Sequence, residues 1–177
     1  WQILAISISH FRSVPFPTPW QTLVRLGQFA AGEPLSDALI YQHISDSLLR
    51  WLAGFGIASL IGLIYGLAVG LSRQLELATG QIVHLLQLIP GLAWIPIAIL
   101  MFGVGEPATI FMICMTAFPP IAITVSSGVR HLDSTYLRAA RMLGATKRAL
   151  FFHILLPASL PSAVSGLRLG MGNGWRV

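Results

Sequence analysis

The sequence predicts an all-α fold, a polytopic bundle of transmembrane helices. Hydrophobic residues make up 55% of the 177 residues and charged residues only 10%, and the mean hydropathy is +0.75. A water-soluble globule of this length needs more polar side chains to cover its surface. Long segments without charged residues alternate with short polar ones, as in helices that cross a bilayer. We therefore expect one transmembrane domain over residues 1–177.

The two ends of the chain are interpreted as cuts in a longer protein. The chain begins at Trp1 without a methionine and stops at Val177 inside an apolar run, so we expect truncation at both ends. Residues 1–10 are mildly apolar and are predicted to be the end of a first span, with a surface segment as the alternative. Residues 11–47 are expected to form an outer segment.

The outer segment is predicted to contain one amphipathic helix. Alternating prolines over 14–19 exclude a helix there. Thr18 can cap a helix whose first residue is Pro19, and Gly32 can end it. We expect this helix to lie flat at the membrane interface as a connector, with contact to an extracytoplasmic partner as the alternative.

Further spans are predicted from the apolar segments that follow. They are 48–71, 81–101, 108–128, and the start of another over 162–177. At about 1.5 Å per residue, the first three are long enough to cross a hydrocarbon core of roughly 30 Å. Arg50 is the only formal charge within 48–71, and 77–105 contains no Asp, Glu, Lys or Arg.

The distribution of cations predicts the direction of the spans. Residues 129–160, which we call the docking loop, carry five of the eleven Lys and Arg residues and one acid, Asp133. The positive-inside rule places this loop in the cytoplasm. Residues 72–80 are then expected inside and 102–107 outside.

Small residues recur at every fourth position in two of the spans. This spacing puts them on one helix face, where another helix backbone can approach closely. The predicted packing residues are Ala58, Gly62, Gly66 and Gly70 in one span, and Gly166 and Gly170, with Ser162 and Gly174, in the last. The alternative is that glycine is simply common in membrane helices.

Prolines occur inside the other two spans. Pro90 and Pro96 bracket a short apolar segment, and Pro119 and Pro120 interrupt the next span, so both helices are predicted to lose internal hydrogen bonds at mid-membrane depth. Backbone groups freed at mid-membrane depth are tolerated only against protein or in a wet cavity. We predict a solute pathway there, with helix kinking as the alternative. Its candidate residues are Gln87, Pro90, Trp94, Pro96, Pro119 and Arg168, the last as a cation that either attracts an anion or snorkels to the headgroups.

Motifs for catalysis are absent from the sequence. It contains no Walker loop, no His-Glu-x-x-His and no Gly-x-Ser-x-Gly, and its one cysteine, Cys114, cannot form an intrachain disulfide or a cysteine metal cluster. We therefore expect no catalytic residue, no metal, no cofactor of its own and no nucleic-acid partner. If transport is active, its energy comes from another subunit.

The docking loop is predicted to hold two short helices around a glycine stop. Gly144 fits a left-handed stop after the first helix. Thr146 can cap a second helix that ends before Pro157. Lys147 and Arg148 in the first turn of that helix oppose its dipole, so an acidic partner is a natural complement.

The spacing in this loop resembles the Glu-Ala-Ala loop of permease subunits of bacterial ATP-binding-cassette importers. That signature is Glu-Ala-Ala, three residues, Gly, nine residues and Ile-x-Leu-Pro. Here Arg138 replaces the glutamate, which puts that acid's contact with the ATPase in doubt, and every spacing is kept. The residues that the resemblance assigns to ATPase coupling are Arg138, Ala139, Ala140, Gly144, Ala145, Thr146, Lys147, Arg148, Ile154, Leu156 and Pro157.

Other segments resemble the branch that imports aliphatic sulfonates, taurine, nitrate and bicarbonate. They include 17–19, 43–50, 89–96, 102–106 and 166–168. The resemblance implies a type I importer permease in the bacterial inner membrane, embedded in lipid and paired with a second permease copy. It also implies an ATP-binding subunit, which uses the ATP, an extracytoplasmic solute-binding protein, and import of a small anion by alternating access.

Two alternatives stay open from the sequence. One is a passive channel or a structural membrane subunit, in which the docking loop is only an anchor. The other is a permease of the same family for a different small solute, such as a thiamine-precursor pyrimidine or cyanate.

Overall fold

The computed structural model describes residues 17–32, 40–132 and 134–177. In these residues all regular secondary structure is helical, which confirms the predicted fold class. The chain divides into two compact units, Trp1–Leu48 and Leu49–Val177. Each unit is described by itself, and the second carries the candidate site.

The first unit contains α2, Pro19–Ala30. The Thr18 hydroxyl accepts a hydrogen bond from the Gln21 amide, and the Gln21 side chain accepts one from the Thr18 amide, which forms a capping box. Gly32 has a φ of 99°, a conformation that favours glycine. The predicted cap and stop are confirmed. The predicted end of a first span, over 1–10, lies outside the described residues.

Helix α3, Ile40–Leu71, begins earlier than the predicted span over 48–71. Its first turns fall in the segment that we assigned to the outer loop. Polarity excludes those residues from an apolar core, but polarity does not end a helix, and 40–53 contain neither proline nor glycine. The helix therefore extends beyond its apolar part.

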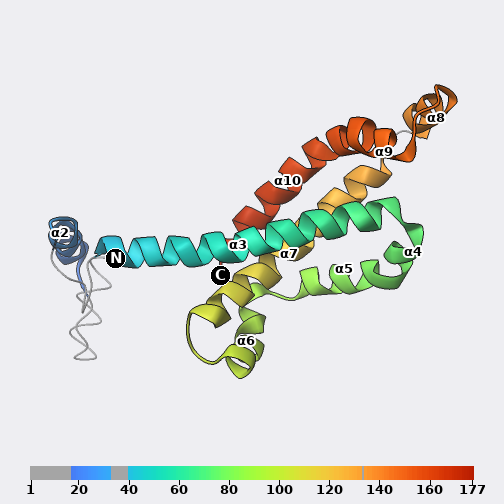
Figure 1. Cartoon of the computed structure of the whole chain (residues 1–177). Coiled ribbons are helices and arrows are strands. Elements are labelled where there is room, and N and C mark those ends of the chain that lie inside the picture. The colour runs from blue at the N-terminus through green and yellow to red at the C-terminus, as the bar shows by residue number, and fades with distance from the viewer. Residues whose placement is uncertain (1–16, 33–39, 133) are drawn as a thin grey trace. The chain divides into compact units, whose positions relative to one another are not determined.

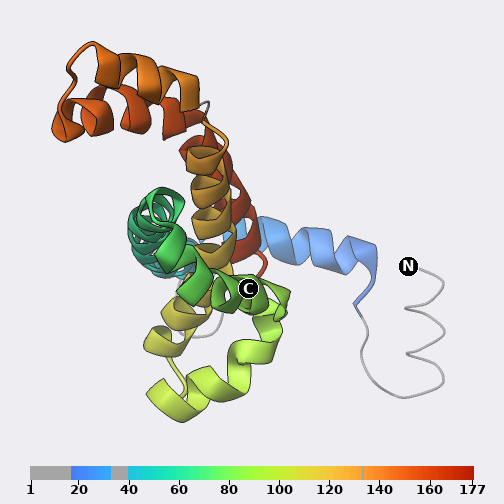
Figure 2. The same ribbon diagram turned by 90° about the vertical axis from the view of Figure 1, so that its right-hand side faces the viewer.

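Helix α7, Glu106–Arg130, is the centre of the second unit. It includes the predicted span 108–128 and packs against both α3 and α10, Leu156–Gly174, which flank it in Figure 2; Figure 1 shows it crossing behind α3. Ile121, Val125 and Pro119 of α7 are the largest fully buried side chains in the described structure. The core is therefore built around one helix that packs against both α3 and α10.

Both predicted sets of small residues face α7. A Cβ atom added to Gly66 of α3 would lie 2.7 Å from Val125 Cβ and 2.8 Å from the Ala122 carbonyl oxygen. A Cβ atom added to Gly170 of α10 would lie 2.5 Å from Ile121 Cγ1. Side chains at these positions would hold the backbones apart, so the close approach depends on their absence.

The predicted span over 81–101 is broken near Pro90, as the prolines within it predicted. The helical segment 73–88 comprises α4 (Arg73–Leu75), the π-helix η1 (Glu76–Gly80) and α5 (Gln81–Leu88). After the break come the 3-10 turn η2 (Gly91–Trp94) and α6 (Ile95–Phe102), and the two halves are bent by 104°. Pro90 has no N–H and pushes Ile89 into an extended conformation, with a ψ of 118°. The bend therefore lies at the first proline.

The other prolines do not break helices, contrary to the prediction for Pro119 and Pro120. Pro96 lies in the first turn of α6, where its missing donor removes no helical hydrogen bond. Pro119 and Pro120 lie inside a continuous α7, buried between its two neighbours. In the turn that follows, the Thr124 hydroxyl donates to the Pro120 carbonyl oxygen at 2.7 Å.

The docking loop also differs from its prediction at Pro157. Helix α8 (Ser134–Met142) is followed by α9 (Lys147–Leu150), which continues through the π-helix η3 (Phe151–Leu155) into α10. The second helix therefore does not end before Pro157, and the last span begins earlier than residue 162. Pro157 falls in the first turn of α10, where it is tolerated, and the wide π turn before it accommodates the change of geometry.

Two ion pairs mark the opposite ends of α7. Glu106 at its start pairs with Arg50 of α3 at 3.4 Å, and Arg130 at its end pairs with Glu76. Residues 72–80 therefore lie at the same end of the bundle as the docking loop, and 102–107 lie at the other end. These relative positions agree with the predicted alternation, and which end faces the cytoplasm stays a prediction.

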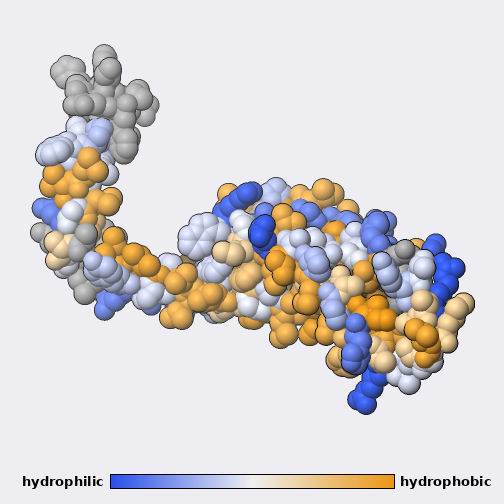
Figure 3. Space-filling model, turned by 90° about the horizontal axis from the view of Figure 1, so that it is seen from above, coloured by the Kyte–Doolittle hydropathy of each residue, from blue (hydrophilic) through white to orange (hydrophobic). Residues whose placement is uncertain are grey.

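Apolar side chains remain exposed over the helices. Figure 3 shows orange, hydrophobic residues over much of the visible surface, with hydrophilic blue ones gathered at the end where Figure 1 places α8. Leu60 and Ile64 on α3 and Leu85 on α5 are more than half exposed. Helices α3 and α7 and the helix Arg148–Gly174 are each long and apolar enough to cross a membrane. Their exposed side chains suit a lipid or protein environment rather than water.

The close packing on α7 gives a first testable prediction. Gly66→Ala should lower the free energy of unfolding by about 1–3 kcal/mol, because its Cβ would collide with the Ala122 backbone. The measurement is thermal unfolding of the detergent-solubilised full-length protein. Gly56→Ala on the same helix is the control, because no atom lies within 4 Å of its Cβ position. Equal stability of the two variants would contradict the packing.

Candidate functional site

The glycine stop of the docking loop has the geometry that its sequence predicts. Gly144 has a φ of 80°. The Gly144 amide donates to the Arg141 carbonyl at 3.0 Å, and the Ala145 amide donates to the Ala140 carbonyl at 3.0 Å. These two bonds define a Schellman motif, which ends α8 sharply. The predicted left-handed stop is confirmed.

Thr146 caps the next helix, as predicted. Its hydroxyl accepts a hydrogen bond from the Ala149 amide at 3.3 Å. Arg138 on α8 and Arg148 on α9 are both exposed. The side chain of Lys147 lies outside the description, although its backbone begins α9. The turn between the two short helices is therefore determined by backbone bonds and leaves two cations at the surface.

A groove separates α8 from the helix that follows it. It has a volume of about 650 Å³ and its lining is mostly apolar. One wall carries Ala139 and Ala140, and the other carries Ile154 and Pro157. The two halves of the signature, separated in sequence by the glycine turn, thus face each other across one groove. The remaining lining residues are Tyr136, Leu143, His153 and Ala158. Leu156 is partly buried at the start of α10 and does not line the groove.

A second cavity, of about 320 Å³, lies beside the broken helix. Its walls come from the break at 86–92, from the middle of α7 and from the end of α10. Its polar side chains are Gln87, Thr116, Asn173 and Arg176, and the described lining residues include no Asp or Glu. The proline break and the proline pair of α7 therefore border the same hollow, which carries one cation.

The structure brings together only half of the predicted pathway residues. Gln87, Pro90 and Pro119 line this cavity. Trp94 is buried elsewhere, with its ring centroid 6.2 Å from that of Phe111 in an edge-on contact. Pro96 is exposed at the start of α6. Arg168 is exposed on α10 and does not line the cavity, because it lies two residues after Gly166, on the opposite side from α7.

Sequence reasoning missed Asn173 and Arg176. Asn173 follows Gly170 by three residues, so helical spacing puts it beside the small-residue face that packs on α7. This spacing could therefore have predicted Asn173 from the sequence. Arg176 follows the last turn of α10, and only the fold shows that this turn reaches the break in the other helix.

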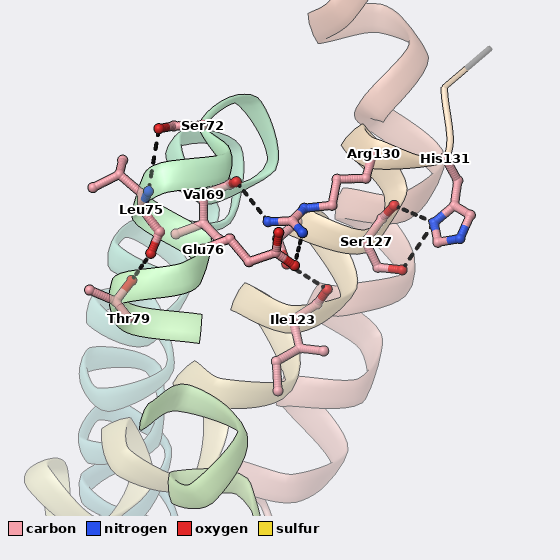
Figure 4. Close-up of polar contacts among 10 residues, drawn as sticks. Val69, Ser72, Leu75, Glu76, Thr79, Ile123, Ser127, Arg130 and His131 are labelled. Carbon is pink, nitrogen blue, oxygen red and sulfur yellow. Dashed lines mark hydrogen bonds and ion pairs between the residues drawn. The ribbon is translucent and has the colours of Figure 1, made fainter. Parts of the chain in front are cut away.

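A third group of polar contacts lies at the docking-loop end of α7 (Figure 4). The Arg130 guanidinium pairs with Glu76 and donates to the Val69 carbonyl oxygen at 3.0 Å. The Tyr65 hydroxyl donates to Thr79 Oγ1 at 2.7 Å, and the Thr79 hydroxyl donates to the Leu75 carbonyl oxygen. These contacts connect α3, η1 and α7.

Among the residues that the structure describes, no three His, Cys, Asp or Glu side chains are grouped so that they could hold a metal ion. The chemistry of the described site is therefore that of helix packing, an apolar groove and a polar cavity.

Comparison with known proteins places the chain in a family. Residues 31–176 match the family described as binding-protein-dependent transport system inner membrane component. The chain is 35% identical to the taurine transport system permease protein TauC of Escherichia coli, over 90% of this chain and 58% of the relative. It is 40% identical to the bicarbonate transport system permease protein CmpB of Synechococcus elongatus, over 80% of this chain and 50% of the relative.

A third relative is the putative aliphatic sulfonates transport permease protein SsuC of Escherichia coli. It is 35% identical over 99% of this chain and 64% of its own length. The chain thus spans between half and two thirds of the length of these curated relatives. On the family match, the all-helical fold and the apolar helices, the chain is a multi-pass inner-membrane protein of the binding-protein-dependent transport system permease family.

Proposed function

We propose that this chain is the membrane-spanning core of a permease subunit in an ATP-driven importer for a small anion. The observation that carries the proposal is the two-walled groove of the docking loop, attached directly to the helix that borders the polar cavity. A partner that moves the loop would act on α7, and α7 forms one wall of the cavity. Helix α7 would thus connect the surface that contacts the ATP-binding subunit to the path of the solute.

The groove suits an ATP-binding subunit as its partner. Ala139, Ala140, Ile154 and Pro157 offer small and apolar surfaces, and Arg138 and Arg148 stand exposed nearby. Such a surface fits a cleft that is apolar within and acidic at its rim. In this proposal the partner binds and hydrolyses ATP, and the permease contributes neither a catalytic residue nor a cofactor.

The polar cavity suits a small anion. Arg176 supplies a positive charge, and the Gln87 and Asn173 amides supply hydrogen-bond donors. A volume of about 320 Å³ holds a small organic or inorganic anion with several waters, since a water occupies about 30 Å³ in the liquid. The names of the relatives, which concern taurine, bicarbonate and aliphatic sulfonates, are consistent with this class.

Alternating access is the proposed mechanism. ATP binding would draw two docking loops together, and the bundle would rock around the solute between inward-open and outward-open forms. The proline break and the π-helical turns η1 and η3 are the natural places for bending. The arrangement calls for a second permease copy within the lipid bilayer and a solute-binding protein on the outer side.

Reconstitution tests the proposal directly. The full-length permease is placed in liposomes with its ATP-binding subunit and binding protein, and taurine, an aliphatic sulfonate, nitrate and bicarbonate are supplied in turn. We expect one loaded binding protein to raise ATP turnover and to drive uptake that stops without ATP. Uptake that proceeds without ATP and only down the gradient would instead indicate a passive channel.

The glycine stop gives a second prediction. Gly144→Val should leave membrane insertion intact but lower the amount of solute imported per ATP, because a β-branched residue resists a φ of 80° by about 1–3 kcal/mol. Its Cβ would meet no atom within 4 Å, so the effect is one of backbone geometry. Gly144→Asn is the control, because asparagine tolerates the left-handed region. A normal import ratio in the valine variant would refute this role.

The cavity gives a third prediction. Arg176→Gln should raise the KM for uptake about tenfold or more, because it removes a charge-assisted hydrogen bond to the anion. Arg168→Gln, on α10 but outside the cavity, should change the KM by less than about twofold. Uptake is measured in the reconstituted system at saturating ATP. A larger effect at Arg168 than at Arg176 would place the anion path elsewhere.

A further inference from the structure

Arg130 joins three elements at the cytoplasmic end of the bundle. It is the last residue of α7 and stands at the start of the docking loop. Its guanidinium pairs with Glu76 and donates to the Val69 carbonyl of α3, as Figure 4 shows. We call these three groups the Arg130 clasp. Arg130, near the start of the docking loop, is thus tied to two other segments.

The partner of Arg130 begins a π-helix. Glu76 is the first residue of η1, and η1 continues directly into α5, which ends at Leu88 beside the break. The same turn is held from α3, through the bond between Tyr65 and Thr79. π-helical turns are rare and occur often at functional sites. The helical segment that leads to the polar cavity is therefore held by α7 and by α3 at its docking-loop end.

The clasp is partly shielded and closely packed. The Arg130 side chain is 26% exposed and the Glu76 side chain 41%. The adjoining cavity, lined by Val69, Glu76, His84 and Arg130 among others, has a volume of only about 30 Å³, room for about one water. Close-packed contacts of this kind transmit displacement rather than absorb it.

The other ion pair of α7 provides a contrast. Arg50 and Glu106 connect α3 and α7 at the opposite end, far along the helix from the docking loop, and Glu106 is 67% exposed. That pair joins α3 to the start of α7, whereas Arg130 and Glu76 join the end of α7 to the π turn η1. Of these two pairs, the one at Arg130 lies next to the docking loop.

We propose that the Arg130 clasp is the coupling link of the permease. Movement of the docking loop shifts Arg130, Arg130 moves Glu76 and the π turn η1, and α5 carries the displacement to the break at Pro90 and to the cavity wall. Arg130 and Glu76 are positioning residues in this account and do not contact the solute. The inference rests on the proposed function, because it needs a motor at one end and a solute path at the other.

The test measures solute imported per ATP in the reconstituted full-length transporter. Glu76→Gln keeps the shape of the side chain but removes its charge, and it should lower this ratio about 2- to 30-fold. ATP turnover stimulated by the binding protein should stay at half of the wild-type value or more, because the docking surface is untouched. Glu106→Gln removes the other ion pair of α7 and should leave the ratio unchanged.

A charge exchange separates coupling from general damage. The double variant Glu76→Arg with Arg130→Glu restores opposite charges, so it should recover at least half of the ratio that Arg130→Glu alone loses. If Glu76→Gln fails to insert into the membrane, the double variant still tests the inference. It must then restore both membrane insertion and the amount of solute imported per ATP.

Three results would overturn the inference. The first is a wild-type ratio in Glu76→Gln, and the second is a double variant no better than Arg130→Glu alone. Both leave the importer function standing, since the wild type still transports. The third is a wild type without stimulated ATP turnover or ATP-driven uptake, which removes the proposed function and the link with it.

Discussion

The close approach of two glycine faces to α7 is the constraint on which the rest of the structure depends. Lipid gives helices no hydrophobic reason to associate, so their association relies on dispersion between closely packed backbones. Gly66 and Gly170 leave no room for a side chain against Val125 and Ile121. Because α7 is held on both sides, its two ends can carry the ion pairs, the docking loop and the wall of the cavity.

Proline has three different effects in this fold, and position decides which one occurs. Pro90 follows an extended residue and lies at the break between 73–88 and 91–102. Pro96 and Pro157 each lie in the first turn of an α-helix, and the π-helix η3 leads into the turn that contains Pro157. Pro119 and Pro120 stay buried inside a continuous α7. The cavity forms where the broken helix meets α7.

The docking loop and the cavity belong to one mechanical arrangement. Gly144 and Thr146 determine the turn between α8 and α9 through backbone bonds, which brings Ala140 and Ile154 to opposite walls of a groove. From this loop α7 runs past the break at mid-length, and Arg130 at its docking-loop end is tied to Glu76. The proposed coupling would use this series of contacts from the loop to the polar residues of the cavity.

Much of this structure can be predicted from the sequence, because several of its determinants act over only a few residues. Composition and apolar length identify membrane helices, cation bias sets the relative sides of the loops, and capping chemistry identifies Thr18, Gly144 and Thr146, because each effect acts within a few residues. Tertiary structure alone decided which prolines bend a helix, that Arg176 and not Arg168 lines the cavity, and that Arg130 meets Glu76. These outcomes depend on which helices are neighbours, and a one-dimensional pattern of polarity does not contain the distances between segments far apart in the chain.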